Sequence, residues 1–370
     1  MGRHVVSTMN RIFDVLKTHV SEDDSHHIVA VNRHIRAEGD EKLVVDFVKS
    51  AKMKTISCYL EVCSLFEYRE QRYLLLPDKY AATIQEIGLE IELDSVAVQG
   101  TGMLAMASGE LPLAKGILSA QVINLCLGIL PEDISKNDIE FQFSELRELF
   151  MPYCVVRMDD SRFSMAYVED INRLIGYLLA DVHASLDEST KGSIKSLLLL
   201  KSSRSIAGSV LNGIQNPLIE YTFLQMYQCI EYLFRLNNCF TISSEHGIAL
   251  GTSMDIVLSN EFKKSESENL LQILRNYAEP ALLEVIVDLS LDGGAGEVAD
   301  VFQKATSYIY KLRCNIAHLR YNQDDLSNVK WAQCVNVLIE VVLSIYQKCD
   351  ENIISVCDEK EAWSLFTMDN

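Results

Sequence analysis

The sequence predicts a predominantly helical protein of two domains: an α+β domain over residues 1–190 and an all-α bundle over residues 200–357, with a tail over residues 358–370. Three observations lead to this fold class. Runs rich in β-branched and aromatic residues, typical of strands, alternate with helical patterns in the first half. In the second half, apolar residues recur at three- and four-residue steps, which is the period of a helix. The polar stretch 187–193 separates the two patterns.

Length and charge limit the functions to be considered. The chain has 370 residues, of which 48% are hydrophobic and 23% charged, as is ordinary for a globular protein. Acidic residues outnumber basic ones by 52 to 33, which gives a formal net charge of −19. A surface of that sign repels nucleic acid and anionic lipid, so any contact with RNA or DNA requires a local basic site.

The compartment is expected to be the reducing cytoplasm. The ten cysteines are dispersed and no two have CxxC spacing, so we expect free thiols. Near the N-terminus, Arg11, Asp14 and Lys17 interrupt any apolar segment that a signal peptide would need. No apolar run approaches the ~18 residues of a membrane-spanning helix, so we expect a soluble protein without membrane contact.

The first domain combines both types of element. Strands are predicted at residues 55–66, 73–76, 91–98 and 153–158, and helices at residues 9–20, 44–51, 144–150 and 168–186. We expect this domain to act as a sensor or regulator that binds a partner protein or a ligand.

The second domain is read as helical throughout. Pro217 starts a helix that continues to residue 234, and residues 267–289 form a second helical stretch that Pro280 breaks or kinks. A glycine-rich turn at residues 292–296 follows. Two strongly periodic helices, 298–321 and 326–349, complete the bundle.

Several well-known site motifs are incomplete or absent in this sequence. Residues 99–105 imitate a dinucleotide-binding turn, but Gly109 and Pro112 interrupt the helix that should follow. The chain contains neither a GxxxxGK[ST] phosphate loop nor a GxSxG nucleophile elbow. The histidines between residues 19 and 34 have no metal-ligand spacing. We therefore expect neither a cofactor nor a metal.

The helix at residues 298–321 carries the most information. With Leu312 at the centre of its apolar stripe, Arg313 falls at about +100° and His318 at about −120°, at 100° per residue. The window 301–323 contains Lys304, Lys311, Arg313 and Arg320 and no acidic residue, whereas the chain average predicts about three. This composition indicates a local cationic surface on an anionic protein.

Arg313 and His318 form an RxxxxH string that, together with Tyr310, resembles the motif of the HEPN superfamily (higher eukaryotes and prokaryotes nucleotide-binding). The aromatic-rich segment 221–234 looks like the opening helix of HEPN domains in bacterial abortive-infection and anti-phage proteins. The resemblance covers residues 205–355 and does not extend to residues 1–190. It departs from the common pattern in one place, because Cys314 follows the arginine and the polar Asn315 comes one position later.

The resemblance implies a helical bundle that acts as a metal-independent endoribonuclease, as a homodimer formed through the Arg313/His318 helix, in phage defence or as a toxin. His318 would move a proton, and Arg313 would hold the phosphate. Cleavage by the ribose 2′-hydroxyl would leave 2′,3′-cyclic phosphates. The implied supporting residues are Asn315, Glu231 and Tyr310, and the implied contacts to the RNA backbone are Lys304, Lys311 and Arg320.

Other interpretations remain open. A HEPN-like bundle could bind nucleotide or protein without catalysis, could transfer a nucleotidyl group, or could be an unrelated bundle in which Arg313 and His318 are structural. Glu231 could orient His318, or it could be a surface carboxylate paired with Arg235. Residues five apart lie about 140° apart around a helix, so one helix alone does not point both groups at one phosphate. A second copy of the helix could close that gap.

Overall fold

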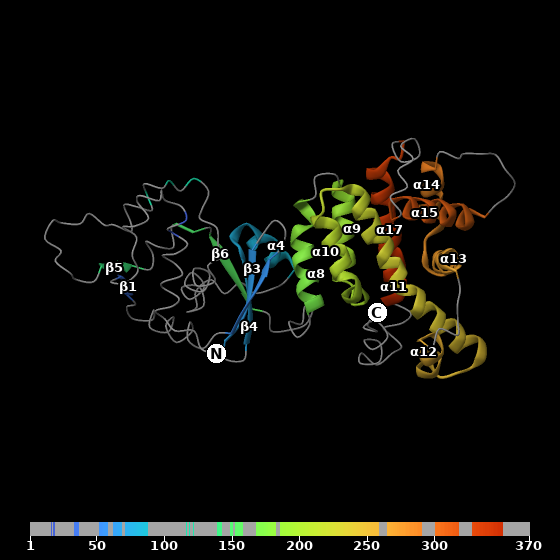
Figure 1. Cartoon of the computed structure of the whole chain (residues 1–370), viewed down its shortest axis with the longest axis horizontal. Coiled ribbons are helices and arrows are strands. Elements are labelled where there is room, and N and C mark those ends of the chain that lie inside the picture. Colours follow the sequence, from blue (N-terminus) through green and yellow to red (C-terminus); the bar gives the residue numbers. More distant parts are fainter. Residues whose placement is uncertain are drawn as a thin grey trace. The chain divides into compact units, whose positions relative to one another are not determined.

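The computed structural model describes two groups of residues. In the N-terminal part these are residues 33–36, 52–57, 62–68, 71–87, 139–142, 149–150 and 152–157, with Leu16, Thr18, Gly116, Leu118 and Gln121. In the C-terminal part they are residues 168–182, 186–258, 265–290, 300–317 and 328–350. The chain divides into two compact units, Met1–Ser161 and Arg162–Asn370. Most described residues are helical (Figure 1), which confirms the coarse fold prediction.

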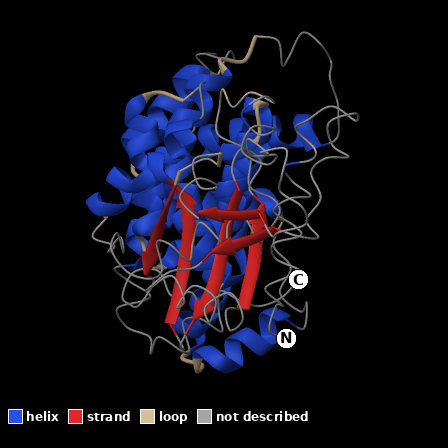
Figure 2. Ribbon diagram, turned by 90° about the vertical axis from the view of Figure 1, so that its left-hand side faces the viewer, coloured by secondary structure: helices blue, strands red, loops and turns tan. Residues whose placement is uncertain are grey.

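The first unit contains a four-stranded antiparallel sheet in the order β2-β3-β4-β6 (Figure 2). Its strands are β2 (Lys52–Ser57), β3 (Val62–Tyr68), β4 (Gln71–Pro77) and β6 (Tyr153–Arg157). In β4, Tyr73, Leu74, Leu75 and Leu76 are all buried. Because successive side chains of a strand point to opposite faces, both faces of β4 are covered. Two short helical segments, η2 (Asp78–Tyr80) and α4 (Ala81–Glu86), directly follow β4 along the chain.

The N-terminal predictions succeed in part. Strands at residues 73–76 and 153–158 are confirmed as β4 and β6. The single strand predicted at residues 55–66 is wrong, because β2 and β3 occupy that region as an antiparallel pair. The parallel pair of β1 (Arg33–Arg36) and β5 (Ile139–Gln142) was not predicted. The strand at residues 91–98 and the helix at 44–51 lie outside the described residues, as do most of the helices at 9–20 and 144–150.

The second unit is a bundle of α-helices joined by two short 3-10 segments. Its helices are α8 (Val168–Leu179), α9 (Glu188–Leu199), α10 (Ala207–Gln215), α11 (Ile219–His246), α12 (Leu250–Leu258), α13 (Glu266–Tyr277), α14 (Pro280–Leu289), α15 (Val301–Ala317) and α17 (Trp331–Cys349). The 3-10 segments are η3 (Ala180–Val182) and η4 (Ser202–Ile206). None of the described helices is long and apolar enough to cross a bilayer.

The core of this unit lies between α11 and α17. The side chains of Phe223, Met226 and Ile230 on α11 are fully or almost fully buried, as the three- and four-residue spacing predicted. Tyr346 of α17 is also buried and donates a hydrogen bond of 2.7 Å to the carbonyl oxygen of Cys229. This bond satisfies the only polar group of a large aromatic side chain, so Tyr346 can be buried at little cost.

The predicted helices of the second half are largely confirmed, with shifted ends. The helix predicted from Pro217 begins at Ile219 and continues to His246, where Gly247 ends it at φ +62° in the left-handed region. Pro280 does separate α13 from α14, because it occupies the first turn of α14. α15 begins at Val301 and α17 at Trp331, later than predicted. α9, α10 and α12 were not predicted.

The predicted domain boundary differs from the observed one. The polar stretch 187–193, predicted to separate the domains, is the start of α9: Asp187 is its N-cap and accepts a hydrogen bond of 2.8 Å from the amide of Thr190. α8 belongs to the helical unit, since it packs against α9 and α10. The polar composition that suggested a linker therefore serves to begin a helix.

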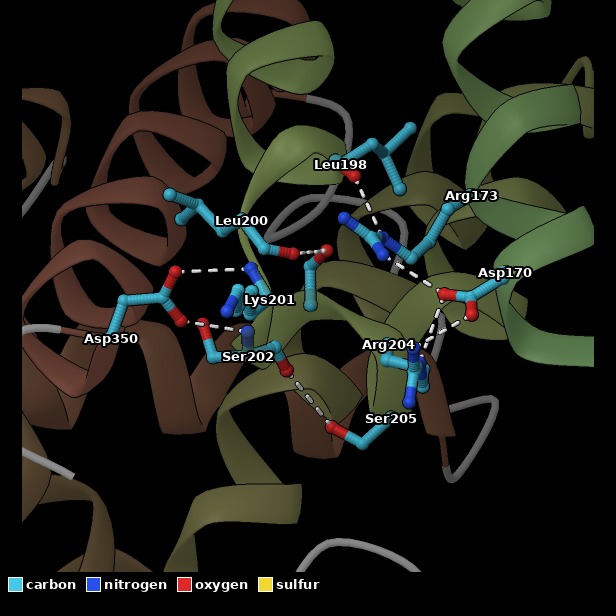
Figure 3. A network of polar contacts seen from close by, with 10 residues as sticks. Asp170, Arg173, Leu198, Leu200, Lys201, Ser202, Arg204, Ser205 and Asp350 are labelled. Carbon is cyan, nitrogen blue, oxygen red and sulfur yellow. Dashed lines mark hydrogen bonds and ion pairs between the residues drawn. The ribbon is translucent and has the colours of Figure 1, made fainter. Parts of the chain in front are cut away.

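A buried ionic network ties α8 to its neighbours (Figure 3). The Asp170 carboxylate, fully buried, accepts from Arg173 at 2.9 Å and from Arg204 of η4 at 2.8 Å. Arg173 also donates from Nε to the carbonyl oxygen of Leu198 at 2.8 Å. Nearby, Asp350 accepts from the backbone amides of Lys201 and Ser202 at the start of η4. Two guanidinium groups thus depend on one carboxylate.

Replacing Asp170 with alanine should destabilise the helical unit strongly. The change removes the buried carboxylate that contacts both Arg173 and Arg204, and breaking a buried ion pair costs ~3–5 kcal/mol. Asp181→Ala is the matched control: it breaks an ion pair of 2.7 Å with Lys195 in which the Asp181 side chain is half-exposed, so we expect a change below ~1 kcal/mol. Urea unfolding followed by far-UV circular dichroism measures both. Equal losses in the two variants would contradict this account of the network.

Candidate functional site

Arg313 lies where three helices meet. It belongs to α15, and its guanidinium donates a hydrogen bond of 3.2 Å from Nη2 to Oε1 of Glu231 on α11 and forms an ion pair of 3.1 Å between Nε and Oε1 of Glu266 on α13. The three side chains are 24%, 30% and 28% exposed, so they are partly shielded from water. α11, α13 and α15 also contact one another pairwise (Figure 1). One cationic side chain thus connects two carboxylates from two other helices.

Local sequence explains where the second carboxylate stands. Ser265 caps α13 in a reciprocal capping box with Glu268, in which the serine hydroxyl accepts from the Glu268 amide and the Glu268 carboxylate accepts from the Ser265 amide. Glu266 is therefore the first residue of the helix, where a negative charge is favoured by the helix dipole. Leu270 and Ile273, both fully buried, anchor α13 to the bundle and fix this position.

Tyr227 completes the cluster from inside the core. Its side chain is buried, and its hydroxyl donates a hydrogen bond of 3.0 Å to the same Glu266 oxygen that Arg313 contacts. The Arg313 guanidinium carbon lies 5.6 Å from the centre of the Tyr227 ring, within range of a cation–π interaction. We call Arg313, Glu231, Glu266 and Tyr227 the Arg313 cluster.

Burial and neighbouring charges displace the pKa values of the Arg313 cluster. Desolvation, followed by the hydrogen bond with Glu266, raises the pKa of Glu231 to about 7, although Arg313 acts in the opposite direction. Burial lowers the pKa of Arg313, but Glu266 and Glu231 outweigh it, so the net shift is upward. Desolvation and the Glu266 charge also raise the pKa of Tyr227. Glu231 therefore exchanges its proton near neutral pH, which most surface carboxylates do not.

The observed partner of Glu231 was not predicted from the sequence. The structure brings Arg313 and Glu231 together, and it pairs Glu231 with Arg313 instead of Arg235. Tyr310 and Asn315 are half-buried on α15, and the hydrogen bond of Tyr310 with Cys314 raises the pKa of the phenol. His318 and Arg320 lie outside the described residues. Whether the imidazole reaches Arg313 therefore stays a prediction.

Two of the three predicted contacts to the RNA backbone, Lys304 and Lys311, lie on the flank of α15 away from Arg313; the third, Arg320, lies outside the described residues. Lys304 and Lys311 are exposed on α15. Nine and two residues before Arg313, they lie about 180° and about 160° away around the helix axis. The buried stripe of Ala305, Ile309, Leu312 and Ile316 is confirmed and occupies the face between them. The lysines and the guanidinium thus border opposite flanks of the same apolar stripe.

Two members of the Arg313 cluster were not singled out from the sequence. Glu266 was missed because the helix was predicted to start one residue later, at 267. The Ser265…Glu268 spacing, a capping-box signature, could have located that start. Tyr227 belongs to the aromatic-rich segment 221–234, whose composition gives no sign of a polar contact 39 residues away along the chain.

Comparisons with known proteins do not extend these observations. No protein-family model, no curated protein and no solved structure matches the chain. Among the residues that the structure describes, no group of three or more histidine, cysteine, aspartate or glutamate side chains is placed to hold a metal ion. The HEPN resemblance therefore rests on the residues of the Arg313 helix and on the aromatic helix α11.

The raised pKa of Glu231 predicts a pH dependence of stability. The folded protein holds the Glu231 proton up to about pH 7, whereas the unfolded chain releases it near ~4.3. The contribution of Glu231 to stability is thus fully present below the unfolded pKa and is lost as the pH rises through about 7. The unfolding free energy of the wild type minus that of Glu231→Gln should therefore increase from pH 8 to pH 5. A difference that is flat or has the opposite slope would refute the assignment; Glu284→Gln on the exposed side of α14 is the control.

Proposed function

We propose that this protein is a metal-independent endoribonuclease of HEPN type that acts in the cytoplasm as a homodimer, in phage defence or as a toxin. The observation that carries the proposal is the position of Arg313, whose guanidinium lies at the junction of α11, α13 and α15 beside a carboxyl that exchanges a proton near neutral pH. A phosphate-binding cation next to a proton-exchanging group is what phosphodiester chemistry requires.

The reaction assigns a separate task to each group. The ribose 2′-oxygen attacks the adjacent phosphorus, its proton passes to a base, and the bond from phosphorus to the 5′-oxygen breaks as that oxygen gains a proton. His318 serves as the proton-transfer group because its reference pKa of ~6.5 lies near neutrality. Arg313 binds the phosphate and stabilises the charge of the pentavalent transition state. The products carry 2′,3′-cyclic phosphate and 5′-hydroxyl ends, and DNA is not cleaved.

Dimerisation supplies what one α15 helix lacks. Residues five apart are separated by about 140° around the axis, so Arg313 and His318 of one copy diverge. Lys304 and Lys311 lie on the flank of α15 opposite Arg313, so they too are directed away from the Arg313 of their own copy. A two-fold axis that runs parallel to α15 brings the flank of one helix beside the opposite flank of its copy. In this arrangement each phosphate is held by Arg313 of one subunit and approached by His318 and the lysines of the other.

The first unit fits a regulatory task in this proposal. We assign residues 1–190 of the sequence prediction, refined to Met1–Ser161 by the division of the chain, to an α+β domain that binds a regulatory protein or ligand and controls access of RNA. Its sheet contributes no residue to the Arg313 cluster, all of whose members come from α11, α13 and α15.

One observation favours a second candidate. Because two carboxylates already engage Arg313, the guanidinium has little surplus positive charge when both are ionised. A non-catalytic HEPN-like module that binds a nucleotide or protein elsewhere on the bundle would use Arg313 only to join α11, α13 and α15. The two candidates differ in one property, the cleavage of RNA.

Cleavage by paired variants tests the ribonuclease. We expect purified wild type to degrade RNA, and expression to arrest growth, while Arg313→Gln and His318→Asn lower the cleavage rate by ~10²–10⁴, the usual range for loss of an acid–base group. Arg235→Gln and His246→Asn, both on exposed positions of α11, are matched controls that should retain activity. Product ends are identified by their 2′,3′-cyclic phosphate. Intact RNA with the wild type, or full cleavage by both site variants, would establish the non-catalytic alternative.

A further inference from the structure

The two carboxylates of the Arg313 cluster occupy one edge of the guanidinium. Glu266 pairs ionically with Nε and Glu231 accepts a hydrogen bond from Nη2, the two nitrogens whose N–H groups point to the same side of the planar group. Within the described residues, Nη1 makes no hydrogen bond, and about a quarter of the Arg313 side chain is exposed. The Nη1 donors therefore stay available for a further acceptor while the carboxylates hold the opposite edge of the guanidinium.

The charge of the cluster opposes an anion at that side when both carboxylates are ionised. Two carboxylates and one guanidinium sum to −1, so a phosphodiester, also −1, meets a net repulsive centre. With one proton on the carboxylate pair the sum is zero, and the Nη1 edge presents its positive charge to the ligand without that opposition. The two carboxyl groups provide a place for this proton, because both lie against the same guanidinium, and desolvation together with the neighbouring Glu266 raises the pKa of Glu231.

We infer that a phosphodiester binds the Nη1 side of Arg313 together with uptake of one proton by the Glu231–Glu266 pair, so that Glu231 and Glu266 are positioning residues of a proton-coupled anion site. The inference rests on the proposed function for the identity of the ligand as RNA. It adds the regulation of that site: the affinity for a phosphodiester rises as the pH falls through neutrality, by up to about tenfold per pH unit when a full proton is taken up.

The groups that face Glu231 are consistent with proton uptake at this position. On its own helix, α11, the hydroxyl of Tyr227 is occupied by Glu266. From α13 comes Glu266 itself, and from α15 come Arg313, with Tyr310 and Cys314 beside it. Arg313 is the member that holds the pKa of Glu231 down. A bound phosphate offsets that positive charge, so ligand binding makes protonation of the pair more favourable, as linkage requires.

Calorimetry of the full-length protein measures the proton directly. The probe is a short single-stranded DNA oligonucleotide, which carries phosphodiesters but no 2′-hydroxyl. The background is His318→Asn, because that imidazole titrates in the same pH range. Binding enthalpies in buffers of different ionisation enthalpy give the number of protons taken up. Above pH 7, we expect the His318→Asn variant to take up about one proton when the oligonucleotide binds. The control that combines His318→Asn with Glu284→Gln should do the same, whereas the combination with Glu231→Gln should take up none.

Each outcome decides the inference. The Glu231→Gln background should also bind the oligonucleotide up to about tenfold more tightly at pH 8 and show no pH dependence. Glu266→Gln is a second variant that removes the other carboxylate, and circular dichroism verifies that each variant is folded. Equal proton uptake with and without Glu231, or no uptake in the His318→Asn background, overturns the inference. If binding is coupled to proton uptake but the wild type does not cleave RNA, only the proposed ribonuclease activity is contradicted. If RNA is cleaved but binding takes up no proton, only the proton coupling is contradicted.

Discussion

The contacts of the Arg313 guanidinium are the interaction on which the candidate site depends. They link the beginning of α13, the middle of α11 and the last turns of α15, three segments that are far apart in the sequence. A planar group with five donors can serve several acceptors at once, which lysine could not do with the same geometry. The same property gives Arg313 a structural task and leaves donors for a ligand. Its chemistry is therefore set by the protonation of its neighbours as much as by its own charge.

The bundle contains two arginine–carboxylate networks, and comparing them shows why one is a candidate site. In the first, Asp170 is fully buried between Arg173 and Arg204, and the charge of Asp350 also acts on Arg173, so the arginines are neutralised within the fold. In the second, around Arg313, negative charge exceeds positive charge and each side chain is a quarter to a third exposed. Buried networks of the first kind fix a structure. Partly exposed clusters with a displaced pKa are more typical of functional sites.

Sequence patterns predicted the structural features that depend on residues close to one another along the chain. The apolar stripe of α15, the break at Pro280 and the strand β4 all follow from local periodicity or from proline geometry, and all are confirmed. The pairing of Glu231 with Arg313 and the role of Glu266 were not predictable in this way, because they depend on which helices pack together. The polar residues that begin α9 were misread for a related reason: a helix cap and a linker have similar composition.

The most direct test of the account observes the guanidinium itself. In nitrogen-15 labelled protein, the Nε–H resonance of Arg313, assigned by its loss in Arg313→Gln, can be followed by NMR while a non-cleavable oligonucleotide is added. The account predicts that this resonance shifts with the same apparent affinity as overall binding, and that the shift is larger below pH 7 than above it. A resonance that stays unchanged while the oligonucleotide binds elsewhere would contradict the assignment of Arg313 as the phosphate-binding group.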